Sequence, residues 1–140
     1  MIGTIIARSK IRSAFKALNN HDINTFIADW RDDAVFIYPG DMSVSGEIKG
    51  KKAIQEWFKK YMEQYPQLKF TIKHICFSNI FDMTGTNHAA VEWDVSAKNR
   101  DGKEIQNSGV TTIQLKLAKA ILIRDYYFDV DKLKEGWGEV

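Results

Sequence analysis

The spacing of apolar residues changes once along the chain, near Pro66, and this change limits the folds that the sequence can adopt. Before Pro66, apolar residues recur three and four positions apart, as they do on one face of an α-helix. This spacing predicts helices over residues 7–18, 23–30 and 54–65. Pro66 ends the last of them, because proline lacks the N–H group that a helix interior needs.

After Pro66, apolar and polar residues alternate, as in strands that are buried on one face. The alternation predicts strands over residues 68–77, 89–97, 104–117 and 120–129. Two shorter strands are predicted earlier, at residues 34–38, before the Pro39-Gly40 turn, and at residues 46–48. Short turns between the later strands favour antiparallel pairing, and the pattern as a whole predicts an α+β fold with a curved, mostly antiparallel sheet.

Composition narrows the class of protein. A chain of 140 residues is the length of a single domain, which we expect to span residues 1–140. A net charge of +2 favours neither nucleic acid nor a membrane surface as the partner. The single Cys76 cannot form an intrachain disulfide, and no signal peptide or long apolar run is present, so we expect a cytoplasmic protein. The three histidines lack metal-ligand spacing, and we expect neither a metal nor a cofactor.

One ordered set of residues carries a family resemblance. It comprises the segment Trp30-Arg31-Asp32-Asp33-Ala34-Val35-Phe36, then Pro39-Gly40, Gly46, Gly50, Ile54 and Phe58, and finally Asp125-Tyr126-Tyr127-Phe128-Asp129. Over about residues 5–130 the chain resembles the SnoaL-like family of the nuclear transport factor two and ketosteroid isomerase superfamily. The resemblance implies a cone: a bent sheet wrapped around a long helix, with a pocket at one end. It implies little about chemistry, because this superfamily includes isomerases, cyclases, dehydratases and non-catalytic binding modules.

The resemblance also tests one mechanism. Ketosteroid isomerases use a tyrosine on the first helix and two aspartates, and the matching positions here are Phe15, Tyr38 and about Thr111. All three residues differ from those that the isomerase needs. We therefore do not expect ketosteroid isomerase chemistry.

Asp125 is the main catalytic candidate. The resemblance favours an inward phase for Ile123, Asp125 and Tyr127, although both faces of the last strand carry apolar residues. An inward carboxyl in apolar surroundings would have a raised pKa, suited to acid–base work near neutral pH. SnoaL-like cyclases are expected to use an aspartate on this strand. The alternative is an exposed Asp125 paired with Arg124 or Arg8.

Other candidates would assist Asp125 or bind the ligand. Tyr38 and Tyr127 could donate hydrogen bonds to a carbonyl or an enolate, although a tyrosine is as often a core residue with its hydroxyl at the rim. His74 is a further catalytic candidate, and a core or surface histidine is the alternative. The candidate ligand-binding residues are Phe15, Trp30, Phe58, Trp93, Asn107 and Thr111, and core packing would explain the aromatic ones almost as well.

The sequence thus predicts a protein that binds a small apolar molecule and performs cofactor-independent isomerisation, cyclisation or dehydration by proton transfer. The alternatives are a non-catalytic ligand-binding or protein-interaction module of the same fold and a purely structural dimer-forming domain. Apolar residues on the outward phase of the last strands predict a homodimer formed through this sheet face: Val110, Leu122, Tyr126 and Phe128.

Overall fold

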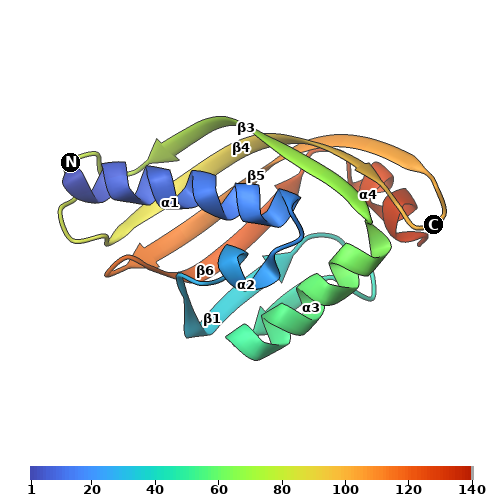
Figure 1. Cartoon of the computed structure of the whole chain (residues 1–140), viewed down its shortest axis with the longest axis horizontal. Helices are drawn as coiled ribbons and strands as arrows, with labels where there is room; N and C mark the ends of the chain where they lie inside the picture. Colours follow the sequence, from blue (N-terminus) through green and yellow to red (C-terminus); the bar gives the residue numbers. More distant parts are fainter. Residues whose placement is uncertain (140) are drawn as a thin grey trace.

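The computed structural model describes residues 1–139, in which four helices accompany a six-stranded sheet (Figure 1). The helices are α1 (Ile2–Asn19), α2 (Ile23–Phe26), α3 (Lys51–Gln64) and α4 (Val130–Trp137). The strands are β1 (Trp30–Tyr38), β2 (Gly46–Lys49), β3 (Gln67–Phe77), β4 (Asn87–Lys98), β5 (Glu104–Lys116) and β6 (Lys119–Tyr127). Within residues 1–139, no helix is both long enough and apolar enough to cross a bilayer.

The strands form one sheet in the order β2-β1-β6-β5-β4-β3. Strands β3 to β6 are an antiparallel meander, while β1 pairs in parallel with β6 and antiparallel with β2. Figure 1 shows α1, α2 and α3 on one face of this curved sheet, with α4 at one end of the molecule. The predicted α+β class and the mostly antiparallel sheet are therefore confirmed.

The inward phase of the strands is also as predicted. In β6, Ile123 and Tyr127 are buried, whereas Leu122 and Tyr126 are exposed on the opposite face. The alternation decides this because successive strand side chains point to opposite faces of the sheet. Asp125 shares its face with Ile123 and Tyr127, so it is directed towards the helices.

The predicted helix over residues 23–30 is wrong beyond its first turn. Helix α2 begins at the Asp22 cap, whose carboxylate accepts a hydrogen bond from the Thr25 N–H, and it ends at Phe26. Trp30 instead begins β1 and pairs with Ala120 of β6. The position of Trp30 is compatible with either a longer helix or a strand. The first buried residue of a strand can lie three or four positions after the last buried residues of a helical turn, and it then continues the helical spacing.

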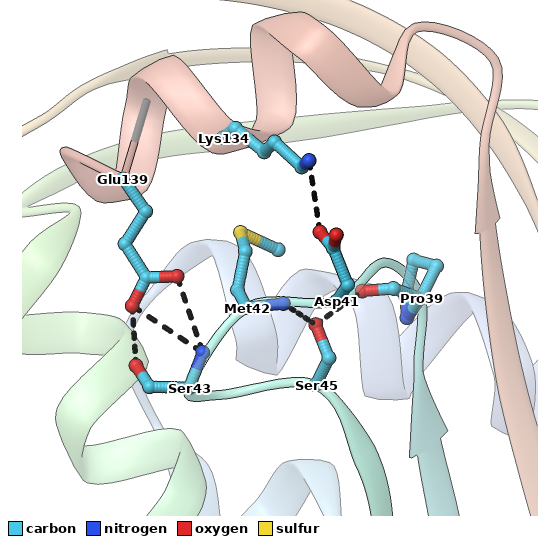
Figure 2. A network of polar contacts seen from close by, with 7 residues as sticks. All are labelled: Pro39, Asp41, Met42, Ser43, Ser45, Lys134 and Glu139. Carbon is cyan, nitrogen blue, oxygen red and sulfur yellow. Dashed lines mark hydrogen bonds and ion pairs between the residues drawn. The ribbon is translucent and has the colours of Figure 1, made fainter.

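Helix α4 was not predicted, and the last strand ends at Tyr127, before Asp129. The Asp129 carboxylate caps α4 by accepting from the Lys132 N–H, and Gly138 ends the helix in the left-handed conformation. Figure 2 shows how α4 is fastened to the loop after β1. Lys134 pairs with Asp41 at 2.8 Å. The Glu139 carboxylate accepts hydrogen bonds from the backbone N–H and the hydroxyl of Ser43.

Gly109 of β5 allows the closest packing within the sheet. A Cβ at this position would lie 2.1 Å from the Tyr126 carbonyl oxygen and 2.6 Å from the Trp93 ring. The backbone oxygen cannot move away without distorting β6. The absence of a side chain at Gly109 therefore leaves the space in which the Trp93 indole packs.

We predict that Gly109→Ala lowers the free energy of unfolding by about 1–3 kcal/mol, because overpacking forces the strands apart. Urea unfolding followed by circular dichroism measures the change. Gln106→Ala, an exposed position on the same strand, is the control and should leave stability nearly unchanged. Equal stability of Gly109→Ala and the parent would contradict the packing argument.

Candidate ligand-binding and acid–base site

A cavity of about 380 Å³ lies between the helices and the inner face of the sheet. Most of its wall is apolar and aromatic. The lining includes Phe15 and Leu18 from α1, Phe26 from α2, Trp57, Phe58 and Tyr61 from α3, and Trp30, Phe36, Tyr38, Thr111, Ile123 and Asp125 from the sheet. A volume of this size accommodates a small organic molecule.

Asp125 provides a carboxyl group on the inner sheet face of this cavity. It retains some accessible surface because it borders the cavity, yet protein atoms surround it on its other sides. Burial raises the pKa of Asp125 to about 7, and the hydrogen bond from Thr111 opposes that rise. Among residues 1–139, no lysine, arginine or histidine pairs with this carboxyl. The neutral and ionised forms are thus both populated near neutral pH.

A chain of two hydrogen bonds orients Asp125. The Trp93 indole N–H donates to the Thr111 hydroxyl oxygen at 2.9 Å, and the Thr111 hydroxyl donates to Asp125 Oδ1 at 2.6 Å. An indole nitrogen can only donate, so the single Thr111 hydrogen is directed to Asp125. Oδ1 is therefore occupied as an acceptor, and Oδ2 is the oxygen left to exchange a proton with a ligand.

Two buried tyrosines add neutral donors to the same cavity. Tyr38 and Tyr61 both line it, and burial raises the pKa of each phenol well above 10. The Tyr38 hydroxyl oxygen accepts from the Trp137 indole N–H at 2.9 Å, which leaves its own proton to donate. Tyrosines kept protonated in this way can stabilise negative charge on a ligand oxygen.

Tyr61 and Trp137 were not predicted to be parts of the site. The apolar spacing of α3 placed Tyr61 on the inner helix face, but this spacing does not separate a cavity wall from a filled core. Trp137 lies on α4, for which no helix was predicted. Lys10 and Asp29 also border the cavity, as a half-exposed ion pair 3.6 Å apart.

Most of the predicted site residues lie in the cavity wall. Asp125 and Tyr38 do so among the catalytic candidates. Among the ligand-binding candidates, Phe15, Trp30, Phe58 and Thr111 do so. The three positions at which a ketosteroid isomerase would carry its catalytic groups, Phe15, Tyr38 and Thr111, therefore all face the same cavity.

Two inward residues lie behind the wall instead of in it. Tyr127 is buried between the Tyr38 and Trp93 rings, with centroid distances of 5.9 and 4.9 Å, and does not line the cavity. Trp93 is fully buried and reaches the site only through Thr111. Their direct roles in catalysis or ligand binding are corrected to packing and positioning.

Two other candidates lie away from the cavity. His74 is exposed on the outer face of β3, 3.8 Å from Glu92, because the pairing of β3 with β4 shifts by one residue between Ile72 and His74. Asn107 joins β5 to the start of α4: its amide donates to the Asp129 carbonyl and accepts from the Asp129 N–H. Neither residue can contact a ligand in the cavity.

The outer face of the sheet carries the apolar residues from which a homodimer was predicted. Leu122, Tyr126 and Phe128 are exposed there, and Val110 is half-buried. Pairing of two copies through this face stays a prediction.

Comparison with known proteins agrees with this architecture. The family model of the SnoaL-like domain matches residues 11–121, most of the chain. The chain belongs to the SnoaL-like family. A search of curated proteins found no match.

Solved structures related to this SnoaL-like chain share its fold. Bal32a, from a soil-derived mobile gene cassette, is 22% identical with a TM-score of 0.81, and the alignment covers 94% of this chain and 95% of Bal32a. A Bacillus subtilis protein provisionally named an isomerase is 22% identical with a TM-score of 0.81, covering 100% and 98%. TerC, co-crystallised with polyporic acid, is 15% identical with a TM-score of 0.77, covering 95% and 98%. At these identities the likeness shows the fold alone.

We predict that Thr111→Val raises the pKa of Asp125 above 7, because the hydrogen bond that favours the ionised form is removed. The free energy of unfolding should also fall by about 1–3 kcal/mol, since the Trp93 N–H loses its buried acceptor. Carboxyl ¹³C NMR titration measures the pKa. Thr111→Ser should restore it and Thr112→Val, on the opposite face, should not change it. An unchanged or lower pKa in Thr111→Val would contradict the proposed orientation.

We predict that stability depends on pH through Asp125. Its pKa is raised on folding, so the folded state holds a proton that the unfolded state releases between about pH 4 and about pH 7. The free energy of unfolding contributed by this group therefore falls as pH rises through that range, by an amount on the order of a few kcal/mol. Urea unfolding at about pH 5 and about pH 8 should show a smaller fall for Asp125→Asn than for the parent. Identical falls would refute this.

Proposed function

We propose that this SnoaL-like protein binds a small, largely apolar molecule in its cavity and catalyses a cofactor-independent proton transfer on it. The observation that supports the proposal is the buried carboxyl group of Asp125 in an aromatic cavity, with a pKa of about 7. A general acid or base works best when its pKa lies near the working pH, since both protonation states are then accessible.

The positions of the polar groups suggest how the reaction proceeds. Asp125 Oδ2 removes a proton from a carbon next to a ligand carbonyl and returns it elsewhere on the same molecule. The neutral phenols of Tyr38 and Tyr61 stabilise the enolate oxygen that forms between these two steps. Isomerisation, cyclisation and dehydration all fit this sequence, because each needs one group that takes and gives back a proton.

The side chains that line the cavity indicate the class of ligand. Aromatic rings on several sides favour a flat or ring-shaped apolar molecule, and few polar groups are present to hold it. A conjugated ketone or quinone supplies both a flat surface and an oxygen for the phenols. The crystallisation of the neighbour TerC with polyporic acid supports this choice of first probe.

We predict that Asp125→Asn lowers turnover at least about 100-fold while ligand binding stays within a few-fold, because the amide fills the same space but cannot take a proton. A panel of cyclic enones, diketones and polyporic acid is first screened for binding by tryptophan fluorescence. Proton removal is then measured as deuterium uptake from D₂O by mass spectrometry, with Asp94→Asn, on the outer face of β4, as the control.

The same assay separates the two function classes. For the parent protein, the rate of deuterium uptake should change with an inflection near pH 7, as Asp125 ionises. Turnover that survives in Asp125→Asn would overturn the mechanism. Tight binding without any deuterium uptake by the parent would instead favour the non-catalytic ligand-binding module.

A further inference from the structure

Exposed apolar side chains gather at one end of the molecule. Ile5 and Ile6 of α1, Ile80, Phe81 and Met83 of the loop between β3 and β4, and Leu117 of the β5–β6 hairpin are all exposed, Phe81 and Leu117 by 69% each. Figure 1 shows the start of α1, this loop and this hairpin together at the end opposite α4. We call the six residues the apolar rim.

Hydrogen bonds hold these three segments side by side. The Thr4 hydroxyl of α1 donates to the Ile80 carbonyl at 3.0 Å. The Ala118 N–H of the hairpin donates to the Gly85 carbonyl at 3.0 Å, and a Cβ on Gly85 would overlap the Ala118 backbone. The apolar rim is therefore built on three segments that are tied together.

The apolar rim also borders the cavity. Ile6 and Met83 are both exposed and both line the cavity, so the cavity reaches the surface between them. Monomeric proteins rarely expose a large contiguous apolar surface without an interaction that covers it. Whatever covers this surface also lies at the cavity entrance.

Charge identifies the partner. Helix α1 contains no acidic residue, and its first basic residue, Arg8, is exposed within one turn of Ile5. The next basic residue of α1, Lys10, pairs with Asp29. Lys116 and Lys119 lie on either side of Leu117 and are exposed. The one acid of the β3–β4 loop, Asp82, is buried, where its carboxylate accepts from the Thr84 and Gly85 N–H groups. Burial alone would raise the pKa of Asp82, but hydrogen bonds from Thr84 and Gly85 lower this pKa overall, so the carboxylate stays ionised. The exposed Arg8, Lys116 and Lys119 still outnumber this one acid, and the end that carries the apolar rim is positive.

We propose that this end docks on the surface of an anionic lipid bilayer, with the apolar rim in the headgroup region and the lysines and arginines against the lipid phosphates. Apolar side chains framed by basic ones are typical of surfaces that lie in the membrane interface. A second copy of the chain fits less well, because two such ends would bring like charges together. This proposal is an alternative to the expectation from the sequence of no membrane partner. If the proposed function holds, an apolar ligand could pass between bilayer and cavity without crossing water.

The test is sedimentation with vesicles of phosphatidylcholine containing about 30% phosphatidylserine, compared with phosphatidylcholine alone. We predict binding to the anionic vesicles that weakens in about 1 M salt, because ions screen the lysines and arginines. The variant I5S/F81S/L117S should lower the partition coefficient at least about tenfold. These side chains are exposed, so folding should be retained, and circular dichroism checks it.

A matched pair of phenylalanines controls for the loss of apolar surface. Phe81→Ser should weaken binding, whereas Phe128→Ser, exposed to a similar degree on the outer sheet face, should not. Asp125→Asn should bind vesicles like the parent, so this result stands whether or not the protein is an enzyme. No sedimentation with anionic vesicles, or equal weakening by Phe81→Ser and Phe128→Ser, would overturn the proposal. Light scattering that shows a dimer of the parent protein and a monomer of I5S/F81S/L117S would also overturn the proposal.

Discussion

The Asp125 carboxyl, which pairs with no cation in the part of the chain that the structure describes, lies in an aromatic cavity. The polar structure of the inner sheet face is arranged around it. Burying an ionised carboxylate in apolar surroundings is costly, so the group takes up a proton more readily than in water. The Thr111 hydroxyl offsets part of this cost, and the Trp93 indole fixes the direction in which Thr111 donates. Gly109 in turn leaves the space that the Trp93 ring occupies. One buried acid thus explains three neighbouring residues on two strands.

The two ends of the cone have opposite characters. At one end, α4 covers the sheet, and the Trp137 indole donates to the Tyr38 hydroxyl. Lys134 and Glu139 hold the loop after β1 through Asp41 and Ser43 (Figure 2). At the other end the cavity meets the surface among apolar and basic side chains. A ligand can therefore reach the cavity from the side that carries the apolar rim, whereas Tyr38 is buried beneath α4 at the other end.

Periodicity predicted most of the elements, because over a long segment a two-residue repeat is typical of a strand and a repeat of about 3.6 residues is typical of a helix. The inward phase of β6 needed the family resemblance, since Leu122 and Ile123 are equally apolar and only one of them is buried. The site was harder to predict. The inward position predicted for His74 was wrong, because the sequence gives no sign of the register shift in β3. Tyr127 does point inward, but an inward position does not show whether a side chain lines the cavity or packs behind its wall. Helix α4 was missed because its buried face rests on only two residues, Leu133 and Gly136, within eight.

The raised pKa of Asp125 links stability to chemistry. A cation beside the carboxyl would have stabilised the folded state and lowered the pKa, leaving a weak base that does not exchange protons near neutral pH. A fully apolar site without Thr111 would have raised the pKa further and kept the acid neutral. The Thr111 hydroxyl holds the pKa of Asp125 between these limits, at about 7. Burial of the carboxyl lowers the stability of the fold, and the raised pKa that results lets Asp125 both give and take a proton near neutral pH. A site of this kind, destabilising for the fold, is what the proposed acid–base chemistry requires.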